Sequence, residues 1–423
     1  MIIKEFVELG QRIEKIWRDK NYSEAVFPDI CSDALEEARL PEKISAFEVL
    51  RWALRSDTLP EQRDLSAKFG DPPITLYNSQ RFHIDVYFWL EGTTKIHQHA
   101  FCGAFQVFHG SSIHSIYDFE IEESINCHTE LGRIDFLNCE LLKVNDIRKI
   151  LPGRDFIHAL FHLDQPSATI VIRTTRSPLH LPQFDYHKPF LAINPFFDEP
   201  NTIKKLQTIS ALMRIHAPET ESLIRETLSN SDFQTAYLIL STVKKHLSSN
   251  RLNQIFGHTQ EKFNSFMGIV QKRYESFNDI LPRVFEQEEK IHEIARLRSY
   301  IQDSELRFFL ALLMNIEGKD RIFQMISARF PDSDPVEKTL DWIESLANTK
   351  ILDVTLNNAL GMEDFSPIDL IALEILLRDL PSEEENDLLR QYGLKPSEDT
   401  RKLLHDRENK LRQLVILSPL ISQ

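Results

Sequence analysis

Two histidines separated by one residue are the first group in the sequence with the types and spacing to bind a metal ion. His97 and His99 stand in the segment KIHQHAFCGAFQVF (95–108), whose alternating pattern predicts a β-strand. Residues two apart in a strand project from the same face, so both imidazoles can reach one ion. Histidine is the commonest metal ligand in proteins. The spacing therefore predicts a metal site on one face of this strand.

The third ligand is expected from a neighbouring strand, and residues 151–163 contain two candidates. This segment, LPGRDFIHALFHL, begins with a Pro-Gly turn and places His158 and His162 on one face of the strand that follows. Because the two histidines lie about 13 Å apart at ~3.3 Å per residue, a regular strand lets only one of them join the histidine pair. We predict that His158, which is nearer the turn, is the third ligand. His162 is the alternative ligand, which replaces His158 if the strand is bulged.

The residues around the histidine pair predict a partly apolar substrate pocket. Phe101, Gly103 and Phe105 have the same parity as the pair, and Gly103, which lacks a side chain, leaves room beside a metal. Arg81 is expected to line the same pocket. Together with Arg173, it is a candidate to hold a substrate carboxylate through bidentate hydrogen bonds. The alternative for either arginine is a solvated position or an ion pair at the surface.

Two polar side chains are predicted to act directly on a bound substrate. Tyr87 lies on the preceding predicted strand, where it can hydrogen-bond a ligand or serve as packing, and Arg173 ends the strand-like run SATIVIRTT. The other histidines nearby, His83, His109 and His114, are expected to be structural or exposed.

The elements that must position these residues follow from changes in periodicity along the chain. Ten of the 15 histidines lie between residues 83 and 187, and six of the 12 glycines lie between residues 70 and 153. In this region short β-branched and aromatic runs with period two are separated by Gly, Asn, Asp or Pro, which predicts an antiparallel sandwich or barrel. Helical periodicity is found before and after it, in residues 3–54, 201–217, 231–247, 259–279, 284–301, 303–316, 335–347, 367–379 and 397–415.

This organisation predicts an α+β chain with three parts. A short N-terminal helical segment covers residues 1–70, a metal-binding β-barrel domain covers residues 71–195, and a large all-α domain covers residues 200–423. The helical segments have no fixed repeat length, so a solenoid is not expected.

Composition restricts the partners of this chain. A formal net charge of −15 excludes a protein that follows nucleic-acid phosphates and disfavours anionic membrane surfaces. The first residues, MIIKEFVELGQRIEKIW, mix Lys, Glu and Arg where a secretory signal needs an apolar run, so a cytoplasmic protein is expected. Four widely spaced cysteines without a C-x-x-C motif are expected to be reduced.

Two segments resemble a known superfamily. GTTKIHQHAFCGAFQVFHG (92–110) resembles the first motif of the cupins, and LPGRDFIH (151–158) resembles their second motif. Residues 89–99, WLEGTTKIHQH, are similar in particular to the first motif of the cysteine-dioxygenase-like thiol dioxygenases. The resemblance covers about residues 70–190 and implies a cupin-type antiparallel β-barrel, or jelly roll.

Departures from the family motifs limit what the resemblance implies. The glutamate ligand of many cupins would fall at Gly103, so the implied site has three histidines, as in thiol dioxygenases. Four residues instead of two separate Gly153 from His158, so the second motif is stretched. The later Ser-His-Tyr relay of the thiol dioxygenases is not evident.

The function implied by this resemblance is that of a mononuclear non-haem Fe(II) oxygenase. Such a metal-dependent dioxygenase would use three histidines as ligands and oxidise a small molecule with O2, a thiol if the closer resemblance extends to the substrate. Imidazole also binds Zn, Ni, Cu and Mn, so the residues do not select the metal. The alternative is a metal-binding cupin that acts as a ligand sensor or protein-interaction module, with a partner protein or a second copy bound by the helical domain.

Overall fold

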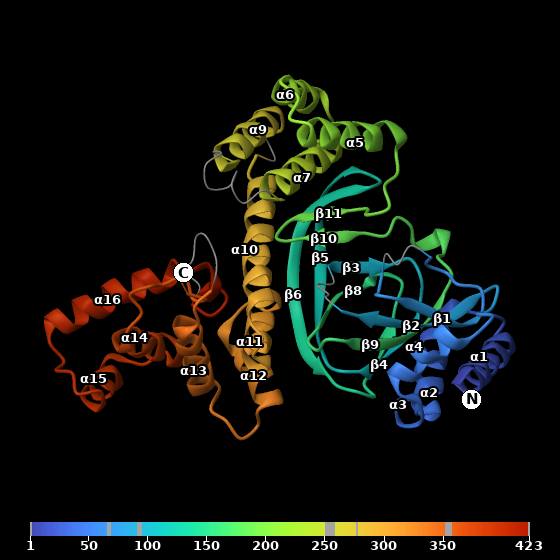
Figure 1. Ribbon diagram of the computed structural model, residues 1–423, viewed down its shortest axis with the longest axis horizontal. Coiled ribbons are helices and arrows are strands. Elements are labelled where there is room, and N and C mark those ends of the chain that lie inside the picture. The colour runs from blue at the N-terminus through green and yellow to red at the C-terminus, as the bar shows by residue number, and fades with distance from the viewer. Residues whose placement is uncertain are drawn as a thin grey trace.

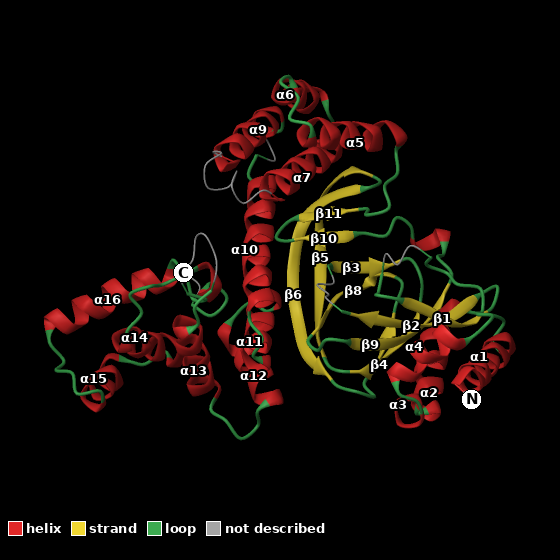
Figure 2. Cartoon of the chain, in the orientation of Figure 1, coloured by secondary structure: helices red, strands yellow, loops and turns green. Residues whose placement is uncertain are grey.

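The computed structural model describes residues 2–65, 69–90, 95–249, 259–275, 278–351 and 358–421. Strands occupy the middle of the chain and helices occupy both ends (Figure 2). The chain is therefore of the predicted α+β class, with a β-barrel, a second sheet and a larger C-terminal region that is helical. The expected turn at Gly92 lies outside the described residues.

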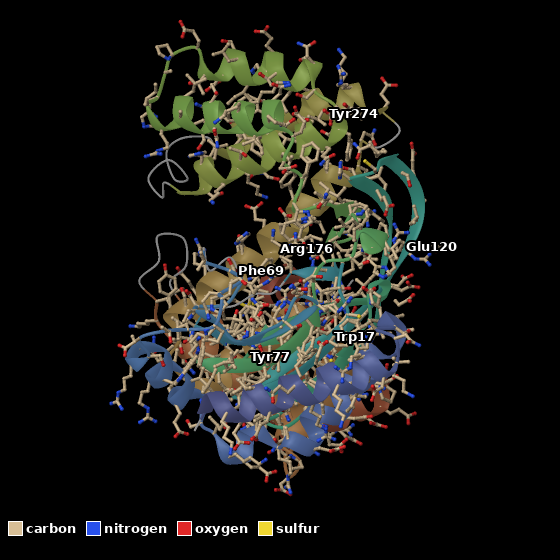
Figure 3. The ribbon with its side chains drawn as sticks, turned by 90° about the vertical axis from the view of Figure 1, so that its right-hand side faces the viewer. Trp17, Phe69, Tyr77, Glu120, Arg176 and Tyr274 are labelled. Carbon is tan, nitrogen blue, oxygen red and sulfur yellow. The ribbon has the colours of Figure 1, made fainter. Side chains whose placement is uncertain are left out.

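The N-terminal helices cover one face of the open sheet. A capping box between Ser45 and Glu48 begins the last of them. Trp17 and Tyr77, both labelled in Figure 3, contact Phe82 of the sheet with ring centroids 6.2 and 5.5 Å away. The elements are α1 (Ile2–Asp19), η1 (Glu24–Val26), α2 (Phe27–Ala38), α3 (Leu40–Lys43) and α4 (Ala46–Arg55).

The strands form two layers in which every pairing is antiparallel. The open sheet has the order β1 (Pro73–Asn78), β2 (Phe82–Trp89), β9 (Ser167–Thr174), β4 (Gly103–His109), β7 (Ile147–Ile150). The closed barrel has the order β10 (Asp185–His187), β11 (Leu191–Ile193), β6 (Thr129–Leu142), β5 (Ser112–Asn126), β8 (Gly153–His162), β3 (Ile96–His99). The long β5–β6 hairpin, which carries Glu120 in Figure 3, curves along the barrel (Figure 1).

Strand alternation decides which side chains enter the space between the two layers. On β2, Ile84, Val86 and Phe88 pack with the N-terminal helices, so the intervening residues face the barrel. A separate apolar cluster joins β4 residues such as Phe105 to Leu160 of β8. Because β4 belongs to the open sheet and β8 to the barrel, this cluster is a core between the two layers.

The C-terminal helices begin where the strands end. They are α5 (Pro200–Arg214), α6 (Thr220–Asn230), α7 (Phe233–Ser249), α9 (Thr259–Arg273), α10 (Ile280–Tyr300), α11 (Ser304–Asn315), α12 (Lys319–Arg329), α13 (Pro335–Asn348), α14 (Pro367–Arg378), α15 (Ser382–Gln391) and α16 (Glu398–Arg412), besides the short turns η2 (Pro178–His180) and η4 (Val415–Leu417). The helices α6, α12 and α15 lie outside the ranges in which the sequence shows helical periodicity. None of the helices in the described part of the chain combines the length and apolar character needed to cross a membrane.

The helical region shares its core with the barrel. Ile113 and Phe161, on β5 and β8, belong to one buried cluster with residues of α10 to α16, and α10 runs beside the barrel in Figure 1. Arg298 of α10 donates a hydrogen bond to the carbonyl oxygen of Leu163 at 3.1 Å. The helices therefore cover the part of the outer barrel face that carries Ile113 and Phe161.

Candidate metal centre

The three histidines predicted as ligands converge at one point between the two layers. One nitrogen from each of His97, His99 and His158 lies within 4.8 Å of the others. His99 and His158 are buried and His97 is partly buried. Nε2 of His99 lies 2.9 Å from Nε2 of His158. The structure thus groups His158, and not His162, with the histidine pair.

An irregular strand pairing brings this group together. His97 pairs with His158 across β3 and β8, whereas His99 pairs with Gly153. Two steps along β3 therefore correspond to five steps along β8. The longer spacing between Gly153 and His158, a departure from the cupin motif, is accommodated by this register shift. Gly153 has φ +68°, a left-handed conformation that glycine adopts without a steric penalty.

Hydrogen bonds at the opposite ring nitrogens leave Nε2 of two histidines available as ligand atoms. Nδ1 of His97 lies 2.7 Å from the carbonyl oxygen of Lys95, which can only accept, so this nitrogen carries the proton. Nδ1 of His158 lies 3.1 Å from Nε2 of His114. In His99, Nδ1 is buried without a hydrogen-bond partner among the described residues, so Nε2 is the atom that meets His158.

The separation of the ligand atoms fits a single ion. Two nitrogens that bind one ion at about 2.1 Å lie about 3.0 Å apart when the angle at the ion is 90°. The 2.9 Å between Nε2 of His99 and Nε2 of His158 is close to that value. Three such donors on one side of an ion leave the other side open for further ligands.

The protonation state of the three histidines also suits metal binding. Burial lowers the pKa of His97, and it lowers the pKa of His99 and of His158 well below the usual range. The neighbouring histidines lower both of the latter further, and Arg173 does so for His99. All three imidazoles are therefore neutral near pH 7, which is the form that binds a metal.

Aromatic rings and one arginine surround the three histidines. The ring of Phe101 lies 4.5 Å from that of His99, and the ring of Phe105 lies 6.3 Å from that of His158. The guanidinium of Arg173 stands over Phe101 at 4.6 Å. Its Nε is buried and makes no hydrogen bond within the described residues, and it lies 4.0 Å from Oδ2 of Asp85. Three residues predicted at the pocket are thus brought to the cluster.

Tyr87 and Arg173 meet at a buried carboxylate. The hydroxyl of Tyr87 donates to Oδ2 of Asp85 at 3.0 Å, and Nε of Arg173 lies 4.0 Å from the same oxygen. Thr75 donates to the other oxygen at 2.8 Å, and His83 lies 3.3 Å from Oδ2. Burial raises the pKa of Tyr87, so its hydroxyl stays protonated. Tyr87 therefore contacts Asp85, which in turn holds Arg173.

Gly103 is required by the packing of two strands, a role that its position in the motif does not reveal. A Cβ at this position would meet the carbonyl oxygen of Ile172 at 1.9 Å. The close approach of β4 to β9 therefore requires glycine here.

Arg81 and His162 lie apart from the three-histidine cluster. Arg81 is exposed, and its guanidinium stands 4.0 Å over the ring of Tyr22. His162 stacks on Trp89 at 4.5 Å, and its Nδ1 lies 3.1 Å from the hydroxyl of Ser112. Burial lowers the pKa of His162 to about 3, so it is a neutral core side chain.

His114 and Glu140 lie beside the three histidines, although His114 was expected to be structural or exposed and Glu140 was not singled out. His114 is only 1% exposed and contacts both His158 and Glu140. Strand alternation shows which face of β5 carries His114. Its partner Glu140 on β6 follows only from the register of the β5–β6 hairpin.

Comparisons with known proteins do not assign this chain to a family. A scan against models of protein families finds no match, and a search of curated proteins finds no significant similarity. The barrel and its three-histidine cluster are compatible with a cupin-like fold, on the geometry and the two motifs alone.

Proposed function

We propose that this chain is a cupin-type oxygenase that binds one Fe(II) ion at His97, His99 and His158 and oxidises a small anionic molecule with O2. The observation that carries the proposal is the convergence of three neutral imidazoles beside Phe101 and the buried guanidinium of Arg173 that stands over it. When bound, the ion would supply redox chemistry and open coordination positions for a substrate heteroatom and O2.

The residues around the cluster would bind and orient the substrate. Arg173 offers a buried cationic donor, and a hydrogen bond to an ionised partner is about twice as strong as a neutral one. Asp85 and Tyr87 hold this arginine on the side of the cluster occupied by Phe101. The phenylalanine rings would exclude water. A thiol with a carboxylate is the substrate class that this arrangement and the motif resemblance favour together.

Anaerobic reconstitution with Fe(II), followed by metal analysis and O2-uptake measurements, tests this proposal. We expect about one iron per chain in the wild type and in His162→Gln, and loss of iron in His99→Ala. The control is matched, because His162 is as buried as His158 and lies on the same strand. The iron-loaded protein is expected to consume O2 only when a substrate from a panel of anionic thiols is present.

Two results would overturn the proposal that this chain is an oxygenase. Iron retained by His99→Ala would place the metal elsewhere. Tightly bound zinc without O2 uptake would instead support the alternative, in which the cupin-type domain senses a ligand and the helical region binds a partner protein or a second copy.

A further inference from the structure

A chain of hydrogen bonds leads from the metal ligand His158 to a carboxylate on another strand. Nδ1 of His158 lies 3.1 Å from Nε2 of His114, and Nδ1 of His114 lies 2.9 Å from Oε1 of Glu140. Arg148 donates from Nε to the same oxygen at 2.7 Å. The four residues come from β8, β5, β6 and β7, so the chain connects the barrel to the open sheet.

The end of this chain determines the direction of every hydrogen bond in it. An ionised carboxylate only accepts, so Nδ1 of His114 must donate to Glu140. In its neutral form, His114 then has a lone pair on Nε2 and accepts from Nδ1 of His158. His158 is left with its lone pair on Nε2, the atom that faces His99. Arg148 lowers the pKa of Glu140 to about 2, and His114 contributes further, which keeps the carboxylate ionised.

We infer that His114 and Glu140 are positioning residues that hold His158 in the tautomer and orientation needed to bind the metal. This inference rests on the metal site of the proposed function, but not on its oxygen chemistry. Partners of this kind fix the ring of a ligand histidine and raise its basicity, and their removal typically weakens metal binding 10- to 100-fold.

The geometry assigns this role to His114 and Glu140 in particular. His114 is paired with Glu140 in the β5–β6 ladder, so the backbone register sets the contact between them. His114 is 1% exposed, which excludes water as a competing partner for its ring nitrogens. The ring of Phe105 meets that of His114 edge-on at 5.7 Å and restricts its rotation.

The inference is tested by Co(II) titration of the full chain under anaerobic conditions, with visible absorption as the readout. We expect the Kd to rise about 10-fold in Glu140→Gln and up to about 100-fold in His114→Phe. The matched control is Glu130→Gln, because Glu130 also lies on β6 and accepts from an arginine, Arg154, at 2.7 Å, but has no contact to a histidine of the site in the described structure. Its Kd is expected to equal that of the wild type.

A double variant separates positioning from a general loss of stability. If Glu140 acts through His114, the Kd of the Glu140→Gln, His114→Phe protein will be no higher than that of His114→Phe alone. The inference would be overturned if the fold-increases in Kd of the two single variants multiplied in the double variant. An unchanged Kd in Glu140→Gln would also overturn it. Should His114→Phe fail to fold, the comparison of Glu140→Gln with Glu130→Gln still decides, because each carboxylate is partly exposed and is replaced by an amide of nearly the same size.

Failure of the two proposals can be told apart. Absence of Co(II) binding by the wild type would overturn this inference and the metal centre together. Normal Co(II) binding without O2 uptake by the iron-loaded protein would reject the oxygenase alone, and the comparison of Kd values would still decide the role of Glu140.

Discussion

His97 and His158 are direct cross-strand partners on β3 and β8, and the register shift that follows them places His99 opposite Gly153. Backbone pairing therefore sets the distance between the first and third ligands, while the irregular step brings the second to the same point. A site fixed by strand pairing is preorganised, because little further ordering is needed when an ion binds.

Binding of a divalent metal is expected to stabilise the folded protein. A ligand that binds only the folded state adds about 2.7 kcal/mol to the free energy of unfolding at 100 times its Kd. The midpoint of thermal unfolding should therefore rise when Ni(II) is added and fall again with a chelator. His99→Ala should show no such rise, and an equal rise in this variant would contradict the assignment of the ligands.

Substitution of Arg173 should weaken substrate binding without loss of the metal. We expect Arg173→Gln to raise the KM for the anionic thiol that gives the fastest O2 uptake by about 10- to 100-fold, since a hydrogen bond to a charged group contributes about 1.5–3 kcal/mol. Metal content should remain at the wild-type value. Arg81→Gln is the matched control, because Arg81 is exposed and stacks on Tyr22 away from the cluster. Equal KM values in the two variants would remove Arg173 from the site.

Gly103 is expected to tolerate no side chain. In Gly103→Ala the new Cβ would stand 1.9 Å from the carbonyl oxygen of Ile172, a backbone atom that cannot move alone. We expect a loss of about 3 kcal/mol in the free energy of unfolding, the upper end of the usual cost of overpacking. The control is Gly268→Ala in α9, where a Cβ would meet no atom within 4 Å and helix propensity should add about 0.5–1 kcal/mol. Denaturant unfolding measures both, and equal stabilities would contradict the close approach of β4 to β9.

A buried ion pair in the C-terminal helices should be important for their stability. Arg407 of α16 donates to Asp369 of α14 from Nε at 2.5 Å and from Nη2 at 2.6 Å, and Asp369 is fully buried. Arg407→Leu leaves this carboxylate with its hydrogen bonds from Ser366 and no cationic partner, at an expected cost of about 3 kcal/mol. Arg390→Leu breaks an exposed pair with Asp387 and should cost less than about 1 kcal/mol. Chemical denaturation followed by circular dichroism compares the two, and similar losses would argue against the buried pair.

Local sequence patterns predicted the α+β class and the three histidines that the structure groups together. Strand alternation places His97 and His99 on one face whatever the rest of the chain does, because the period of a strand is fixed by its backbone. Strand spacing also predicts that only one of His158 and His162 joins the pair, and the structure groups His158 with it. Apolar periodicity predicted most of the helices after residue 200, because each of them buries one face in one of two apolar clusters.

Tertiary structure decided the relationships between elements, which local patterns do not contain. The sequence could not show that β4 and β9 approach closely enough to require Gly103, or that Arg81 is directed to the surface. No local sequence feature separates His114 from His162. The β5–β6 register nevertheless places His114 between His158 and Glu140. The sequence by itself determined which faces carry the imidazoles. Long-range strand pairing alone determined which side chains support them, because pairing partners are set by the global packing of the two layers.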